Sequence, residues 1–379
     1  MRFIHTADWQ MGMRRRWLDE DAQARYQDAR LAAVARAGDL AARSGAAFLL
    51  AAGDVFESNF LDERTVRRVL EMLRGMPVPV YLLPGNHDPL DPASIYRSPL
   101  FRRHCPRGVT VLEPGRVVEA APGVELVGAP WQARREAPNP LLPLLEALPP
   151  PAGLRIVAAH GDMEPYGHEG DPARIPLAPV EAALDTGRLH YLALGHRHSR
   201  TAVGQSNRIW YSGSPEPTDF DEVDPGQVLL VDVEPEGVRV EAFATGTWHF
   251  VDRHLALDPA DPAGSLRGLL DSLPDRDRTV LRLSLEGEVG LEERLALESL
   301  IEEERALFAA IDRREDRDRL AAPARGGDPP PPGLTGFAAA AWAELAEAAR
   351  EGDAEARYAL GLFHRLVSEG RPPEEEPSA

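Results

Sequence analysis

Short apolar runs that end in glycine or a polar residue recur along the first 250 residues of the chain. Each run is nearly continuous in hydrophobicity, which is typical of strands covered on both faces of a sheet. The segments 116–128 and 227–243 predict further strands, in hairpins or at the far side of a second sheet. The runs are RFIHTAD at 2–8, AFLLAAGD at 47–54, VPVYLLPGNHD at 78–88, RIVAAHGD at 155–162, YLALGHRH at 191–198 and RIWYSGSP at 208–215.

Helical patterns lie between these runs. Residues 21–45 and 62–75 carry apolar side chains at helical spacing, and both segments stop at a glycine. In the second segment Val66, Val69 and Leu70 share one face. Strands that alternate with helices predict an α/β domain over residues 1–250.

The pattern changes from about residue 251. TVLRLSLEGE at 279–288 alternates like a half-exposed strand, and LEERLALESLIEEERALFAAIDRRE at 291–315 predicts one helix, so residues 251–320 form a small α+β module. Residues 321–333 contain four consecutive prolines and predict a linker. Two short helices are expected within 334–369, and the ending at 370–379 is expected to be disordered.

Composition and charge narrow the class of protein. The formal net charge of -19 argues against a chain that grips nucleic acid through its overall field, so any DNA contact must be local. The single cysteine, Cys105, excludes an intrachain disulfide, and the chain starts without a charged and apolar leader. No run of 18 or more apolar residues occurs, so we expect a cytoplasmic protein that does not span a membrane.

The polar residues at the strand ends carry the candidate chemistry. Open α/β sheets place their ligand sites just beyond the carboxyl ends of their strands. A pair of divalent ions that activates water needs carboxylate, imidazole and amide ligands and one bridging carboxylate. The strand ends supply that inventory with Asp8, Asp54, Asn86, His87, His160, His196 and His198.

In order and spacing these motifs resemble those of the calcineurin-like metallophosphoesterases. HTADW at 5–9, GDVFES at 53–58, LPGNHD at 83–88 and YSGSPEPTDFDE at 211–222 are similar, more narrowly, to the DNA repair exonuclease branch, the SbcD-type nuclease subunit. The resemblance implies a four-layer α/β sandwich of two mixed β-sheets flanked by helices. A nuclease domain at 1–250 would then precede a capping domain at 251–320 and C-terminal helices.

The same resemblance implies two divalent metal ions, with manganese as the expected element. His87 would not bind metal but would act beside the scissile phosphate, and Asp88 would orient it through a hydrogen bond. The implied ligands are Asp54 as the bridge, Asp8, Gln10 and His198 for one ion, and Asn86, His160 and His196 for the other.

Gln10 departs from the family pattern, which usually offers a histidine at this position. A glutamine carbonyl oxygen can coordinate a metal, but it is a weaker donor than imidazole toward manganese or zinc. Three consequences stay open: an active site with one labile ion, a changed metal preference, or a site with one ion and little activity.

The implied function is that of a metal-dependent DNA exonuclease and endonuclease, the nuclease subunit of a DNA repair complex. It would hydrolyse phosphodiester bonds with a hydroxide activated between the two ions. Two alternatives remain: a phosphatase or small-molecule phosphodiesterase on the same fold, and a catalytically weak scaffold for DNA ends or a partner, as Gln10 would allow.

DNA contacts and a protein partner complete the expectations. Arg14, Arg15 and Arg16 with Trp17 combine cations for phosphates with an aromatic ring for a base of a single strand or DNA end. In the resembled family, helices such as those in 334–369 dock on an SMC-like ABC ATPase subunit of SbcC type, and a homodimer is also open. Other arginines expected on or near the metal side are Arg102, Arg103, Arg107, Arg134, Arg135, Arg197 and Arg200.

Overall fold

The computed structural model describes residues 1–135, 138–235, 237–321 and 334–351, together with 353, 355–356, 359–361 and 363. The chain divides into two compact units, Met1–Phe250 and Val251–Ala379. The linker and the disordered ending predicted from sequence lie, except for residue 321, outside the described residues. None of the described helices is long and apolar enough to cross a membrane.

The first unit contains two six-stranded mixed sheets. Each has a parallel core, which antiparallel strands extend at one edge of the first sheet and at both edges of the second. The first sheet has the order β12 (Gly237–Ala244), β11 (Gln227–Glu234), β1 (Arg2–Thr6), β2 (Leu49–Ala51), β3 (Val80–Leu82) and β4 (Val109–Val111). The second has the order β5 (Val117–Ala121), β6 (Val124–Ala129), β7 (Leu154–His160), β8 (Tyr191–Gly195), β10 (Ile209–Tyr211) and β9 (Thr201–Val203).

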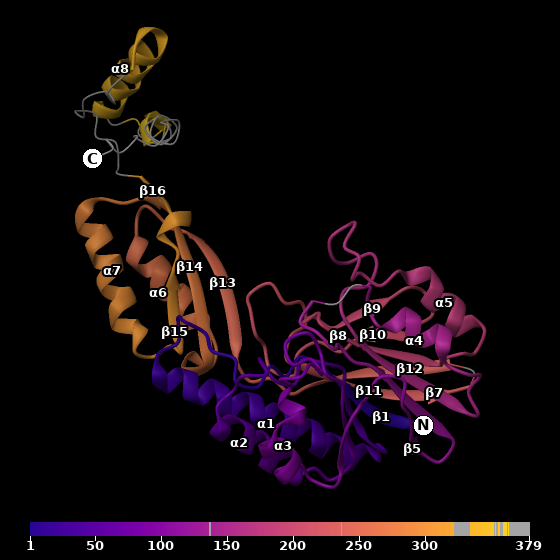
Figure 1. Ribbon diagram of the computed structural model, residues 1–379. Helices are drawn as coiled ribbons and strands as arrows, with labels where there is room; N and C mark the ends of the chain where they lie inside the picture. The colour runs from indigo at the N-terminus through magenta and orange to yellow at the C-terminus, as the bar shows by residue number, and fades with distance from the viewer. Residues whose placement is uncertain are drawn as a thin grey trace, which may run out of the picture. The chain divides into compact units, whose positions relative to one another are not determined.

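Three apolar cores stack these elements into four layers. Side chains such as Phe3 and Leu50 of the first sheet pack against Ile156 and Tyr191 of the second. Each outer face is covered by helices, which Figure 1 shows on opposite sides of the pair of sheets. The predicted fold class, an α/β sandwich of two mixed sheets flanked by helices, is thereby confirmed. The helices are α1 (Glu20–Ser44), α2 (Glu63–Arg74) and α3 (Pro99–His104) on the first sheet, and α4 (Leu141–Ala147) and α5 (Leu177–Asp185) on the second.

Capping residues at the ends of α1 and α2 explain where these helices begin and where α1 ends. The side chain of Asp19 accepts a hydrogen bond from the Ala22 backbone N–H, and Asp62 does the same for Thr65, so each helix has an acidic N-cap. Helix α1 ends at Gly45, whose φ of 67° is favourable for glycine. The two predicted helices are therefore confirmed at the positions that their punctuation indicated.

The second unit has its own four-stranded sheet and its own apolar core. The predicted helix at 291–315 is wrong in its second half, because α7 ends at Arg305 and Ala310–Arg313 forms β15. This strand pairs in parallel with β14, which buries Phe308 and Ile311 against the sheet, and that burial outweighs the helical pattern. The elements are β13 (His249–Ala256), α6 (Pro262–Ser272), β14 (Thr279–Glu288), α7 (Leu291–Arg305), β15, β16 (Arg319–Ala321) and α8 (Gly336–Arg350), and short 3-10 helices occur at Ile95–Arg97, Arg276–Arg278 and Glu315–Arg317.

Candidate metal centre

The loops after the parallel strands bring the predicted metal ligands together. Asp8, Asp54 and His160 follow or end β1, β2 and β7, and one ligand atom from each lies within 4.8 Å of the others. All three side chains are buried. The strands come from both sheets, so the cluster sits where the carboxyl ends of the two sheets meet.

Four residues in or near this cluster have a strained backbone. Asp8, Gln10, Asp54 and His196 have φ values of 53°, 42°, 51° and 104°, and they make up four of the seven described non-glycine residues with positive φ. Such conformations cost about 1–3 kcal/mol each and persist where the surrounding structure holds them for a function. The concentration of strain at these four residues therefore marks the cluster as a functional site.

Two glycines allow the ligands to approach one another. A Cβ atom on Gly53 would lie 2.0 Å from Nδ1 of His160, and a Cβ atom on Gly85 would lie 2.1 Å from Oδ1 of Asp54. Gly53 also has a φ of 105°, which an L side chain rarely adopts. The glycines in the GD and GNHD motifs therefore make room for the donor atoms.

The surroundings of His160 require a cation. Its Nδ1 donates a hydrogen bond of 3.0 Å to the Ala52 carbonyl oxygen, whereas its Nε2 faces Asn86 Oδ1 at 2.9 Å and Asp54 Oδ2 at 3.3 Å. A neutral ring that donates from Nδ1 would turn a lone pair toward two oxygens. The gap between these three atoms must hold either a proton on Nε2 or a metal ion, so the donor set fits a metal.

The contact between His160 and Asp54 shifts the pKa of both side chains. Burial alone lowers the pKa of His160, but the charge of Asp54 and its hydrogen bond outweigh burial and raise that pKa to about 9. Burial alone would raise the pKa of Asp54, but the charge of His160 holds it below its usual range. The metal-free protein therefore keeps an imidazolium against a carboxylate at neutral pH.

We predict that cation binding releases the His160 proton. Because the pKa is raised from 6.5 to about 9, metal and proton compete, and the metal affinity is expected to rise about tenfold per pH unit between roughly pH 7 and 9. Calorimetry in buffers of different ionisation enthalpy measures the released proton. In the metal-free protein the raised pKa stabilises the fold below pH 6.5, and this contribution is lost as the pH rises through about 9. A metal affinity independent of pH would contradict the prediction.

Asn86 and His196 extend the cluster beyond His160. Nδ1 of His196 lies 3.2 Å from Asn86 Oδ1, and its Nε2 lies 3.5 Å from the carboxylate of Asp162. A carboxylate on the far nitrogen is the usual way in which a metal-binding histidine is oriented. The backbone N–H of His196 also donates to both oxygens of Asp8, at 3.1 and 3.0 Å, and so ties the two sheets together at the site.

His198 lies on the other side of Asp8 and is oriented in the same manner. Its Nδ1 donates to Thr218 Oγ1 at 2.6 Å and lies 3.2 Å from Glu222 Oε1, so its Nε2 keeps a lone pair. That Nε2 lies 4.0 Å from Asp8 Oδ1. Burial alone lowers the pKa of His198, but the hydrogen bond to Glu222 and the charge of Asp8 raise it.

Gln10 lies beside His198 and Asp54. Its side-chain nitrogen is 3.1 Å from His198 Nε2, and its backbone N–H donates to the Asp54 carbonyl oxygen at 2.8 Å. Its side-chain oxygen is buried and has no hydrogen-bond partner. A buried acceptor without a partner costs about 1–3 kcal/mol, which a cation at this position would offset.

The role of His87 beside a substrate phosphate stays a prediction, whereas the structure contradicts the role given to Asp88. Nδ1 of His87 donates to the Glu57 backbone carbonyl oxygen at 3.1 Å. Asp88 is fully buried and accepts hydrogen bonds from the backbone N–H groups of Gly85 and Phe56 and from a tyrosine hydroxyl, so it braces the loop and does not orient the ring. Asp88 was assigned from its neighbourhood in sequence, but its side chain points to the other side of the loop.

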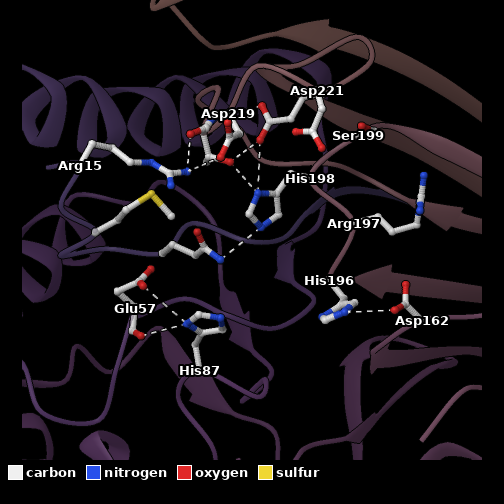
Figure 2. Close-up of a pocket in the computed structure, with 14 residues that line it drawn as sticks. Arg15, Glu57, His87, Asp162, His196, Arg197, His198, Ser199, Asp219 and Asp221 are labelled. Carbon is white, nitrogen blue, oxygen red and sulfur yellow. Dashed lines mark hydrogen bonds and ion pairs between the residues drawn. The ribbon is translucent and has the colours of Figure 1, made fainter. Parts of the chain in front are cut away.

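Three of the histidines, His87, His196 and His198, line one pocket of about 510 Å³. Figure 2 shows His87 beside Glu57 and His196 beside Asp162, with His198 above both in this view. The sequence did not single out the residues that hold these rings, although each lies in a motif. These partners are Glu57 in GDVFES, Asp162 in RIVAAHGD, and Thr218 and Glu222 in YSGSPEPTDFDE.

The proposed DNA-contact residues differ in their surroundings. Arg14 and Arg16 are exposed and do not line this pocket. Arg15 lines the pocket and donates to the Thr218 carbonyl oxygen, with Asp219 at 3.6 Å. Trp17 packs between Arg15 and Phe220, so its ring faces protein on both of these sides. Their contact with DNA stays a prediction.

Comparisons of the sequence and of the structure found similar proteins. Residues 1–200 match the family model described as calcineurin-like phosphoesterase. An uncharacterized metallophosphoesterase of Bacillus subtilis, YhaO, is 25% identical over 256 residues, which are 63% of this chain and 59% of that protein. The chain thus spans less than two thirds of that relative. A solved structure of a dimetal phosphatase from Danio rerio has 12% identity and a TM-score of 0.42, and it covers 64% of this chain and 96% of its own.

Proposed function

Since the chain belongs to the calcineurin-like phosphoesterase family, whose members use divalent metals to hydrolyse phosphoesters, we propose that it is a metal-dependent DNA nuclease of the SbcD type. The observation that carries the proposal is the convergence of donor atoms from both sheets around Asp54, next to an open pocket. DNA as the substrate rests on the similarity of the four motif stretches to that branch. In sequence, a second compact unit, Val251–Ala379, follows the first, as the proposed capping domain would.

The two donor groups define where cations would bind. Asp54 would be common to both groups, because its carboxylate lies 3.3 Å from His160 Nε2, and one ligand atom each of Asp8, Asp54 and His160 lie within 4.8 Å of one another. When bound, divalent cations acidify water and stabilise the negative charge that develops on a phosphate. One group consists of Asp8, Gln10, Asp54 and His198, and the other of Asp54, Asn86, His160 and His196.

The protein's own groups position the substrate and move protons. His87 lines the pocket, and its hydrogen bond to the Glu57 carbonyl oxygen fixes the ring while Nε2 remains available to a substrate. When Nε2 also carries a proton, a histidine so placed can stabilise negative charge on the phosphate and transfer that proton to the leaving oxygen. Asp162 and Glu222 keep His196 and His198 in their orientations.

The substrate class is tested with purified protein, manganese, a labelled single DNA strand and, in parallel, a generic aryl phosphodiester. We expect manganese-dependent cleavage of the strand. Turnover of the aryl ester alone would identify a small-molecule phosphodiesterase. No turnover of either compound in any divalent metal would identify a scaffold and overturn the proposal.

Replacing Gln10 with histidine is expected to strengthen binding of the cation at Asp8, Asp54 and His198 by about tenfold or more. Imidazole is a stronger donor toward manganese than an amide oxygen is. Manganese-dependent cleavage is expected to stay equal or rise. Histidine suits the position, since it is one of the residues found more often at positive φ, and Gln10 has a φ of 42°. Calorimetry with manganese measures the effect.

The matched control for this substitution is Gln10→Ala, which removes the donor and leaves the backbone unchanged. It is expected to weaken the same ion. Unchanged affinity in both variants would place Gln10 outside the coordination sphere.

We also propose that the segment 334–369 binds an ATPase partner subunit. Trp342 and Ala346 of α8 pack against Ala356 and Leu360, whereas Phe337 is 89% exposed. Two short helices alone are marginal in water, so a partner surface would stabilise them. Deletion from residue 334 is expected to leave cleavage of short oligonucleotides intact and to abolish co-purification with an SMC-like ATPase subunit. Loss of folding would instead assign these helices to the core of the protein.

A further inference from the structure

A second pocket, of about 330 Å³, adjoins the metal centre. It shares Asp162 and His196 with the first pocket, and Asn86 lines it as well. Its lining also includes Asp171 and three arginines, Arg134, Arg135 and Arg174, and we call it the arginine pocket. A ligand that lies at the metal centre can therefore extend into the arginine pocket without crossing protein.

The first pocket does not favour a second phosphate. Of its two arginine cations, Arg15 binds the Thr218 carbonyl oxygen beside Asp219, and the guanidinium of Arg197 lies over the ring of Tyr166, 3.9 Å from its centre. Its carboxylates outnumber these cations. They are Glu57, Asp162, Asp219, Asp221 and Glu222.

The arginine pocket has the opposite character. Among the described residues, none of its three guanidinium groups forms an ion pair, and only Arg174 has a hydrogen bond, from Nε to the Tyr166 carbonyl oxygen. Its carboxylates are engaged elsewhere: Asp162 faces His196, and Asp171 accepts from the Ala173 backbone N–H at 2.8 Å. Cations without a carboxylate partner, next to a phosphoester site, are arranged to receive an anion.

Hydrogen bonds connect the lining of the arginine pocket to the metal centre. The indole N–H of Trp131 donates to the His160 carbonyl oxygen at 2.7 Å, and the side-chain nitrogen of Asn139 donates to the same oxygen at 2.9 Å. The segment that carries Arg134 and Arg135 thus starts from a residue anchored to a metal-ligand candidate. An anion held there would lie close to the metal-ligand candidates Asn86 and His196, which line the same pocket.

We propose that the arginine pocket binds the phosphate next to the scissile phosphate in a single DNA strand. This inference rests on the proposed nuclease function and names the direction in which the substrate strand continues. Guanidinium groups suit the task, because their planar donors match phosphate oxygens in pairs. A substrate with one phosphate would not use the pocket.

The test compares the double variant Arg134→Gln/Arg135→Gln with Arg64→Gln/Arg67→Gln on α2, which also removes two exposed arginines but lines neither pocket. Binding of a fluorescently labelled single-stranded oligonucleotide is measured by anisotropy in EDTA at several salt concentrations. The first variant is expected to bind about 10- to 100-fold more weakly than wild type. The slope of log affinity against log salt is expected to fall by about 0.7, because the neutralisation of one phosphate is lost. The control is expected to bind like wild type.

Cleavage in manganese adds a second measurement. The KM for the strand is expected to rise in the first variant, with no change in turnover of an aryl phosphodiester that has one phosphate. Equal binding by both variants, or an equal loss on both substrates, would overturn the inference, as would a wild type that does not bind the strand. If the wild type binds but cleaves nothing while the affinity difference persists, the nuclease proposal fails and the anion pocket stands.

Discussion

Substituting Asp54 with asparagine is expected to abolish binding of both cations and to lower phosphodiester hydrolysis by roughly 10²–10³-fold or more. Asp54 is 2% exposed, and one of its oxygens lies 3.3 Å from His160 Nε2 while the other accepts the His87 backbone N–H at 2.9 Å. Asparagine has the same shape and keeps an acceptor for that N–H, but it removes the charge that the two donor groups share. Calorimetry with manganese and a cleavage assay measure the two effects.

The matched control is Asp221→Asn, which neutralises an exposed carboxylate of the same pocket. This control is expected to keep both cations. Two cations bound to Asp54→Asn with wild-type affinity would show that Asp54 does not join the two donor groups.

Replacing His87 with glutamine is expected to lower the cleavage rate by about 10²–10⁴-fold, the usual contribution of a general acid or base. The number of bound cations is expected to stay the same, because the ring contacts Glu57 and none of the predicted ligands through its side chain. Metal content by mass spectrometry and single-turnover rates separate these two effects.

The control for His87 is His104→Gln at the end of α3, which lines neither pocket. It is expected to leave the rate unchanged. A His87 variant that loses a cation would mean that His87 is a ligand, and one with a normal rate would remove it from the reaction.

Much of the fold could be predicted because each core strand is a short apolar run that ends in glycine or a polar residue. β1, β2, β3, β7 and β8 are all of this kind, and the same punctuation marks the metal-ligand candidates. Periodicity and local punctuation were sufficient wherever a single strand or helix decided the outcome. The error at α7 arose because pairing of Ala310–Arg313 with β14 is a non-local contact, which a helical pattern does not reveal.

The residues that orient the ligands were not predictable in the same way. Glu222 reaches His198 across a loop, and Asp162 reaches His196 from a different strand end. Their spacing in sequence follows no period, so only the folded loops show these pairs. Asp88 shows the converse: it is adjacent to His87 in sequence, but it bonds to Gly85, Phe56 and Tyr96.

Anomalous diffraction from a crystal soaked with manganese is the most direct measurement of the central claim. We predict two manganese positions, both in contact with the Asp54 carboxylate, about 3.5–4 Å apart as in other two-metal sites. One would lie among Asp8, Gln10 and His198, and the other among Asn86, His160 and His196. No manganese at Asp54, or a single ion bound away from it, would contradict the account.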